Sequence, residues 1–153
     1  MIVVDASLWF DLFNEGDKAR LRLAEELFSR VEGLVIYEPV LFKVEFAGLL
    51  VRYNPREVVE QLVEEVLTRI NLCLDIDDEA YRVALVTGSR VADAYYIACA
   101  HKTKSILFSN DRAQVLSARR YGIEAYCLLE DRDKAFSRLD NIRKTLSNES
   151  TYR

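Results

Sequence analysis

Two aspartates stand at or just after the ends of short apolar runs, where a buried strand is expected to end. Asp5 follows the apolar run of residues 2–4, and Asp111 comes shortly after the run of residues 105–108. Apolar runs that stop at polar residues are typical of buried parallel strands before a loop. Because ligands in open α/β sheets bind beyond the carboxyl ends of the strands, we expect both carboxylates at one edge of a sheet.

Both aspartates also have a purely structural interpretation as helix caps. Asp5 could accept hydrogen bonds from the backbone at the start of the next helix. Asp111 is followed three residues later by Gln114, which is the spacing of a capping box. Residue types alone leave the two interpretations open.

Two further acids interrupt predicted helices that are otherwise apolar. The neighbours of Glu45 at helical spacing are Leu41, Phe42, Gly48 and Leu49. Asp93 lies early in the stretch of residues 91–100, which contains no other charge. Burying an unpaired carboxylate costs on the order of several kcal/mol, so each needs a cation, a proton or contact with water. Arg52 is a candidate partner for Glu45, and Arg90, three residues back, is one for Asp93.

A convergence of the four carboxylates would create strong mutual repulsion unless a divalent cation neutralised it. Oxygen ligands without histidine or paired cysteines favour Mg²⁺ or Mn²⁺ over Zn²⁺. The three cysteines are far apart in the sequence, and His101 is the sole histidine, so neither a zinc site nor a histidine-based catalytic triad is indicated.

The rest of the chain predicts the elements that would hold these residues. We expect Ser7, Asn54, Asp77 and Ser89 to cap helices. The predicted strands are residues 2–4, 34–37, 71–75, 105–108 and 123–128, and the predicted helices include residues 8–13, 17–32, 39–53, 77–88 and 90–102. Strands separated by helices indicate a three-layer α/β sandwich with a mainly parallel five-stranded sheet flanked by helices. We expect one domain over residues 1–129 and a charged, partly helical C-terminal tail over residues 130–153.

Charge is unevenly distributed over this acidic chain, which has a formal net charge of -4. Residues 57–79 carry eight acids against one base, whereas residues 101–120 carry five bases against one acid. The basic segment could form a local anion-binding face, or it could be an ordinary solvated helix surface. No apolar run approaches the roughly 20 residues of a membrane span, and no basic segment precedes an apolar one at the start. We therefore expect a cytoplasmic protein with no membrane partner.

In its ordered motifs the chain resembles the PIN-domain family, and especially the VapC-type toxins of prokaryotic toxin-antitoxin pairs. The motifs are Val3-Val4-Asp5-Ala6-Ser7, Val44-Glu45-Phe46-Ala47, Asp93-Ala94-Tyr95-Tyr96-Ile97-Ala98 and Ser109-Asn110-Asp111. They span residues 1 to about 128. The resemblance implies a nuclease domain over residues 1–129 that cleaves RNA with Mg²⁺ or Mn²⁺ held by Asp5, Glu45, Asp93 and Asp111. It implies Ser7, with Ser109 or Asn110, as support for the metal or the phosphate. It further implies an antitoxin partner and a homo-oligomer, dimeric or larger.

One position departs from the family pattern. Family members often carry another acidic or polar residue two positions after the last aspartate, where this chain has Ala113. This departure puts a second tightly held metal ion in doubt and leaves open a catalytically weak RNA-binding or assembly module. A haloacid-dehalogenase-like phosphatase is disfavoured, because that family needs a second aspartate where this chain has Ser7.

Basic residues near the acidic motifs are the candidates for contacts with RNA phosphates. Arg112 is the first candidate because it adjoins Asp111. The others are Lys43, Arg90, Arg119 and Arg120.

Overall fold

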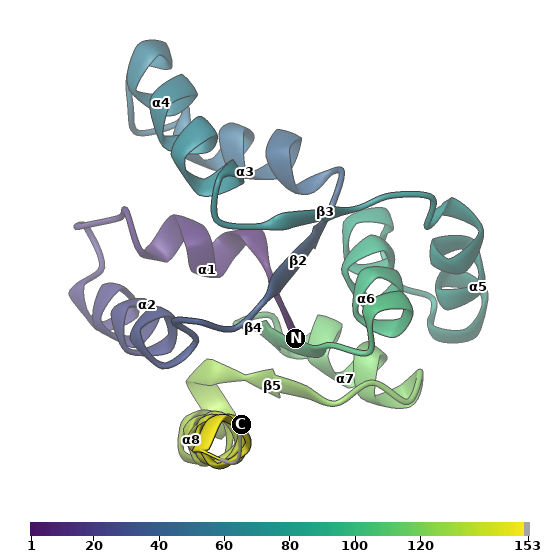
Figure 1. The fold of residues 1–153 in the computed structure, drawn as a ribbon. Coiled ribbons are helices and arrows are strands. Elements are labelled where there is room, and N and C mark those ends of the chain that lie inside the picture. The colour runs from purple at the N-terminus through teal and green to yellow at the C-terminus, as the bar shows by residue number, and fades with distance from the viewer. Residues whose placement is uncertain (152–153) are drawn as a thin grey trace.

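The structure is a computed structural model that describes residues 1–151, with side chains to residue 148. Strands and helices alternate along the chain. Figure 1 shows the elements in order. The strands are β1 (Ile2–Val4), β2 (Ile36–Pro39), β3 (Asn71–Cys73), β4 (Ile106–Ser109) and β5 (Ala125–Cys127). The helices are α1 (Ala6–Asp11), α2 (Lys18–Arg30), α3 (Phe42–Leu50), α4 (Arg56–Leu67), α5 (Asp77–Thr87), α6 (Val91–Thr103), α7 (Arg112–Arg120) and α8 (Leu128–Thr151).

The five strands form one sheet in the order β3-β2-β1-β4-β5, and every neighbouring pair is parallel. The apolar, β-branched run of β1 is fully buried because it lies at the centre of this sheet. β1 pairs with β2 on one side and with β4 on the other, so the chain changes direction across the sheet at β1. The predicted fold class is confirmed, and the sheet is entirely parallel.

Helices cover both faces of the sheet, which gives three layers (Figure 1). α6 packs against the three central strands and α7 against β4 and β5, with α5 outside α6. α1 and α2 lie on the opposite face, where α2 contacts α8. α3 packs on α1 and α4 at the β2–β3 end of the sheet. Trp9, Phe42, Phe46, Tyr96 and Phe108 are among the largest fully buried side chains of the core.

Several predicted element ends were wrong, for local reasons. Ser7 does not cap the first helix, because Asp5 caps it two residues earlier and the Asp5 side chain accepts the Ser7 backbone N–H. The strand predicted to end at residue 37 continues to Pro39, because Glu38 is paired in the ladder with Leu72 of β3 and is buried. The predicted caps Asn54, Asp77 and Ser89 are likewise replaced, since Pro55, Ile76 and Arg90 are the N-cap residues.

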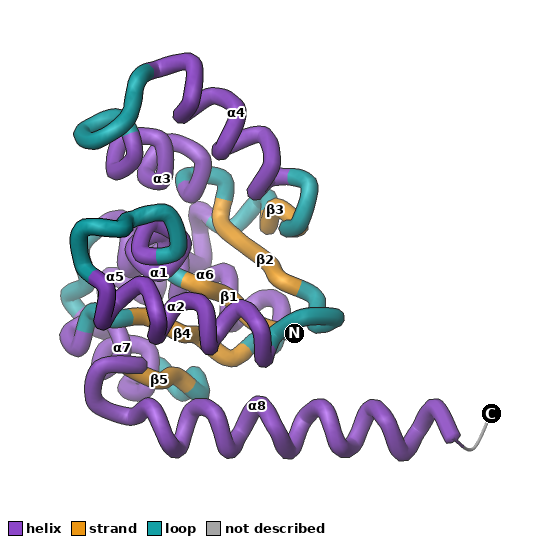
Figure 2. Tube along the Cα trace, turned by 90° about the vertical axis from the view of Figure 1, so that its left-hand side faces the viewer, coloured by secondary structure: helices purple, strands orange, loops and turns teal. Residues whose placement is uncertain are grey.

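The predicted C-terminal tail forms a helix over its described length. α8 begins at Leu128, directly after β5, and has one non-helical residue at Asp131. Ala135, Phe136 and Leu139 are buried, and beyond them the helix extends past the rest of the molecule (Figure 2). Residues 152–153 of the predicted tail lie outside the described residues. Among the described residues, no helix is both long and apolar enough to cross a bilayer.

Candidate active site

An open cleft of about 450 Å³ lies where the chain changes direction across the sheet, beyond the carboxyl ends of β1 and β4. This is the position at which open α/β sheets bind ligands. All four acids expected at one site line this cleft, although two come from helices, α3 and α6, and two follow the strands β1 and β4. The lining residues are Asp5, Ser7, Arg20, Glu45, Leu49, Arg90, Asp93, Asn110, Asp111 and Arg112.

Asp5 is the most buried of the four carboxylates, with an exposed fraction of 7%. Its backbone N–H donates to the carbonyl of Phe108 over 3.0 Å, which fixes the end of β1 beside the end of β4. Its side chain accepts hydrogen bonds from the hydroxyl and the backbone N–H of Ser7. Burial raises the pKa of Asp5 to about 6, with the nearby Glu45 and Asp93 adding to the rise and the Ser7 hydrogen bonds opposing it. Asp5 therefore caps α1 and also faces the cleft, so the two interpretations of this residue are compatible.

Glu45 is held by a tyrosine and not by the arginine suggested by the sequence. The hydroxyl of the fully buried Tyr96 donates to Glu45 Oε2 over 2.8 Å. Among the described residues, Arg52 forms no ion pair with Glu45. Burial raises the pKa of Glu45, the Tyr96 hydrogen bond opposes this, and the charge of Asp93 adds to it.

Arg90 joins the remaining two carboxylates. Its Nε atom lies 3.2 Å from Asp93 Oδ2, and its Nη2 atom lies 3.0 Å from Asp111 Oδ2. Burial raises the pKa of Asp93, and the charge of Arg90 opposes that rise. The ion pair expected between Arg90 and Asp93 is therefore present, and the contact with Asp111 was not foreseen.

Asp111 is the N-cap residue of α7. Its Oδ1 atom accepts the backbone N–H groups of Ala113 and Gln114, and its own N–H donates to the hydroxyl of Ser109 over 2.9 Å. Ser109 is fully buried and does not line the cleft. The reciprocal half of the expected capping box is absent, because the buried side-chain oxygen and nitrogen of Gln114 have no hydrogen-bond partner among the described residues.

Asn110 connects the cleft to an acid that the sequence analysis missed. Its amide nitrogen donates to Asp11 Oδ2 over 3.2 Å, and Asp11 is 2% exposed. Arg20 lies 3.9 Å from the same carboxylate and lines the cleft. Asp11 lies at the end of a six-residue helix and Arg20 in a surface helix, so no local pattern in the sequence marks either residue.

Of the five basic residues proposed to bind RNA, two line the cleft and three lie outside its lining. Arg90 and Arg112 line the cleft, with Arg112 Nε 3.6 Å from Glu130. Lys43 is exposed on α3 and does not line the cleft. Arg119 and Arg120 also lie outside the cleft lining, and their side chains donate to the backbone carbonyls of Ala125 and Thr87.

Glu38 is a second acid that the sequence analysis missed, and it is fully buried in β2. Its Oε1 atom accepts the backbone N–H of Val4 over 3.1 Å and the indole N–H of Trp9 over 3.0 Å. Burial holds the pKa of Glu38 well above its usual range. Through these hydrogen bonds Glu38 links β2 to Val4, the residue that precedes Asp5.

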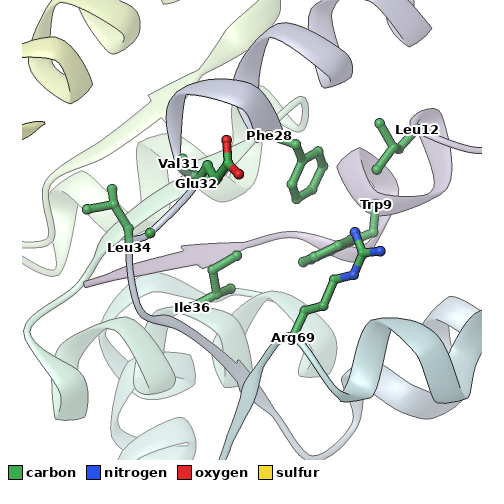
Figure 3. A pocket seen from close by; sticks show the side chains of 9 residues that line it. Trp9, Leu12, Phe28, Val31, Glu32, Leu34, Ile36 and Arg69 are labelled. Atoms are coloured by element: carbon green, nitrogen blue, oxygen red, sulfur yellow. The ribbon is translucent and has the colours of Figure 1, made fainter.

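Trp9 also forms part of a separate cavity of about 360 Å³ between α1, α2 and β2 (Figure 3). This cavity shares no lining residue with the acidic cleft. Its walls are mainly apolar, and its charged residues are Glu32 and Arg69. It offers no group of carboxylates and is therefore not the candidate active site.

Hard divalent cations prefer oxygen ligands, and the cleft is lined by carboxylate oxygens. It also contains the buried side-chain oxygen of Asn110, which has no hydrogen-bond partner among the described residues. Among the described residues, however, no three acidic, histidine or cysteine side chains are grouped closely enough to hold one ion as they stand. Arg90 occupies the space between Asp93 and Asp111. The residues fit a cation chemically, and the side chains would have to adjust to hold it.

The all-parallel sheet and the cleft at its carboxyl edge define the class of α/β domains with a carboxylate-lined site. The chain belongs to the PIN domain family, because its sequence matches the family model described as "PIN domain" over residues 2–117. PIN domains are generally nucleases and typically use divalent metals such as Mg²⁺.

Solved structures support the fold assignment. The chain is similar to PAE2754 from Pyrobaculum aerophilum, with a TM-score of 0.61 and 20% identity over 92% of this chain and 96% of that one. It is also similar to FitAcB from Neisseria gonorrhoeae, with a TM-score of 0.60 and 14% identity over 82% of this chain and 96% of that one. A chain of FitAB bound to an IR36 DNA fragment gives a TM-score of 0.59 and 14% identity over 82% of this chain and 94% of that one. A search of curated protein sequences found no significant match.

Proposed function

We propose that this chain is an endoribonuclease that hydrolyses RNA phosphodiester bonds with the help of Mg²⁺ or Mn²⁺. The observation that carries the proposal is the gathering of Asp5, Glu45, Asp93 and Asp111 around one cleft. The pKa values of three of these acids are raised, with burial as the largest cause and neighbouring carboxylates adding to it. Burial and mutual repulsion disfavour the charged carboxylates, and a divalent cation would supply the positive charge that offsets both effects.

Asp5, Glu45 and Asp93 are the residues we expect to hold the metal most directly, with Asp111 beside them and Ser7 and Asn110 in support. A bound Mg²⁺ or Mn²⁺ lowers the pKa of a water molecule and neutralises charge on the phosphate. The chain's own residues fix the geometry: Tyr96 orients Glu45, and the Phe108 carbonyl holds the backbone of Asp5. Arg112 and Arg20, at the rim of the cleft, would receive the RNA phosphates.

We further propose that the chain is the toxin of a toxin-antitoxin pair. Its motifs resemble those of VapC-type toxins, and a chain of similar fold belongs to FitAB, which was solved bound to a DNA fragment. In this proposal residues 1–129 are the nuclease domain, residues 130–153 extend it, and the protein works in the cytoplasm as a homo-oligomer with an antitoxin partner. Co-purification of the chain with the product of an adjacent small gene would test the partnership.

Cleavage of single-stranded RNA tests the proposed activity. Wild-type protein is incubated with varied RNAs in Mg²⁺, in Mn²⁺ and in a chelator, and we expect cleavage only with the metals. Asp93→Asn should abolish cleavage, because it removes the negative charge that attracts the cation and retains the shape. Glu57→Gln is the matched control, since it neutralises an exposed acid of α4 that does not line the cleft. Metal-dependent cleavage by Asp93→Asn at the wild-type rate would refute the mechanism.

A second candidate function is a catalytically weak module that binds RNA or assembles with other proteins. Arg90 favours it, because this residue already pairs with two of the four carboxylates. Ala113 favours it as well, because it adds no polar group at the start of α7. RNA binding without cleavage of any RNA tested, in either metal, would support this candidate over the nuclease.

A further inference from the structure

The side chain of Arg90 lies between two of the four carboxylates of the cleft. Its Nε and Nη2 atoms contact one oxygen each of Asp93 and Asp111, at 3.2 Å and 3.0 Å. Arg90 is the N-cap residue of α6 with an extended backbone, and its side chain makes no capping hydrogen bond. The guanidinium is therefore committed to the two acids and not to the helix.

Both carboxylate oxygens of Asp111 already accept hydrogen bonds. Oδ1 accepts the backbone N–H groups of Ala113 and Gln114 at 2.8 Å and 3.2 Å, and Oδ2 accepts from Arg90. A cation that approached Asp111 Oδ2 would meet the positive charge of Arg90, and Oδ1 is engaged by the cap of α7. Asp5 and Glu45 have no arginine within ion-pair distance among the described residues, and each accepts a hydrogen bond from a hydroxyl group.

We propose that Arg90 takes the place of a second metal ion between Asp93 and Asp111, so that this cleft binds a single divalent cation on the side of Asp5, Glu45 and Asp93. This inference rests on the proposed function, and it specifies how many ions the site takes. Guanidinium suits the position because its planar fork reaches two carboxylates at once and its charge is permanent. Ala113 fits the same division, because two positions after Asp111 it adds no side-chain ligand atom beside that carboxylate.

The number of bound ions tests this assignment without reference to activity. The full chain, freed of metal by dialysis against a chelator, is titrated with Mn²⁺, and bound ions are counted by the loss of the free Mn²⁺ signal in electron paramagnetic resonance. Four proteins are compared: the wild type, Arg90→Gln, Arg90→Lys and Arg112→Gln. Arg112→Gln is the matched control, because it removes one positive charge from the same cleft but leaves the contacts of Asp93 and Asp111 intact.

We expect one Mn²⁺ per chain for the wild type, for Arg90→Lys and for Arg112→Gln, and a second ion for Arg90→Gln. Circular dichroism confirms that each variant is folded, and Arg90 is suited to substitution because its side chain is 77% exposed. Two ions bound by the wild type, or one ion bound by Arg90→Gln with unchanged affinity, would overturn the role of Arg90 and leave the proposed nuclease standing. A second ion bound by Arg112→Gln would show that removing any positive charge from the cleft admits another ion. That result would also overturn the specific role of Arg90. No Mn²⁺ bound by any of the four proteins would overturn the proposed function together with this inference.

Discussion

Replacing Asp5 by asparagine should make the metal-free protein more stable at neutral pH. Burial raises the pKa of Asp5 from 3.8 to about 6 in the folded state. Each pKa unit corresponds to about 1.4 kcal/mol, so ionised Asp5 destabilises the fold by about 3 kcal/mol. Asparagine never ionises, and it caps a helix about as well as aspartate. Its buried N–H group should offset about 1–2 kcal/mol of the gain.

The net gain of about 1–2 kcal/mol corresponds to a rise in Tm of about 3–6 °C for a domain of this size. The sign depends on pH. Because the folded pKa is raised, the wild type loses stability as pH rises from about 4 to about 6, and the loss is complete above that range. Thermal unfolding in a chelator at about pH 4 and about pH 7.5 should therefore show the advantage of Asp5→Asn only at the higher pH.

Two further measurements connect this stability change to the site. Millimolar Mg²⁺ should raise the Tm of the wild type, because it binds the folded state alone, and should leave Asp5→Asn unchanged. Asp17→Asn is the control, since Asp17 caps α2 through the N–H of Arg20 but is largely exposed and outside the cleft. It should change neither the pH dependence nor the cleavage of RNA. An Asp5→Asn variant that is less stable than the wild type by the same amount at both pH values would refute the reasoning.

Three other substitutions have defined expected outcomes. Asp111→Asn should keep the cap of α7 and alter the free energy of unfolding by less than about 0.5 kcal/mol. The same variant should lose RNA cleavage in Mg²⁺. Cleavage at the wild-type rate would count against Asp111 as a site residue. Glu38→Gln should retain both accepted hydrogen bonds. Glu38→Ala should lower the free energy of unfolding, measured in urea, by about 2–4 kcal/mol, because the N–H groups of Val4 and Trp9 lose their partner. Equal stability of the two variants would contradict this. Arg112→Ala, in a cleavage-deficient background, should reduce the slope of RNA affinity against salt by about one unit; an unchanged slope would remove Arg112 from the RNA path.

The fold and the position of the cleft could be predicted because they follow from local patterns. The apolar runs before Asp5 and Asp111 mark strand ends, and the parallel sheet brings strand ends to one edge. Glu45 and Asp93 were recognisable because each interrupts an apolar helix. The residues that complete the site depend on contacts between distant segments, and local patterns do not encode those.

Tyr96 and Arg90 illustrate what the sequence could not show. Tyr96 lies 51 positions from Glu45 and looks like an ordinary core aromatic, yet its hydroxyl replaces the expected contact with Arg52. The contact of Arg90 with Asp111 spans 21 positions, and only the fold brings the N-cap residues of α6 and α7 together. Glu38 was placed outside its strand because the apolar run ends at Tyr37, and only the ladder with β3 shows that it is buried.

The direction of α8 has a practical consequence for how the protein can be handled. This helix starts at the carboxyl end of β5 and runs back past the sheet, so its described end lies on the same side of the molecule as Met1 (Figure 2). The cleft is at the opposite edge, beyond the ends of β1 and β4. An affinity tag, a fluorophore or a solid support joined to either of these ends would thus leave the carboxylates open to solution. RNA binding and metal titrations can consequently be measured on immobilised protein.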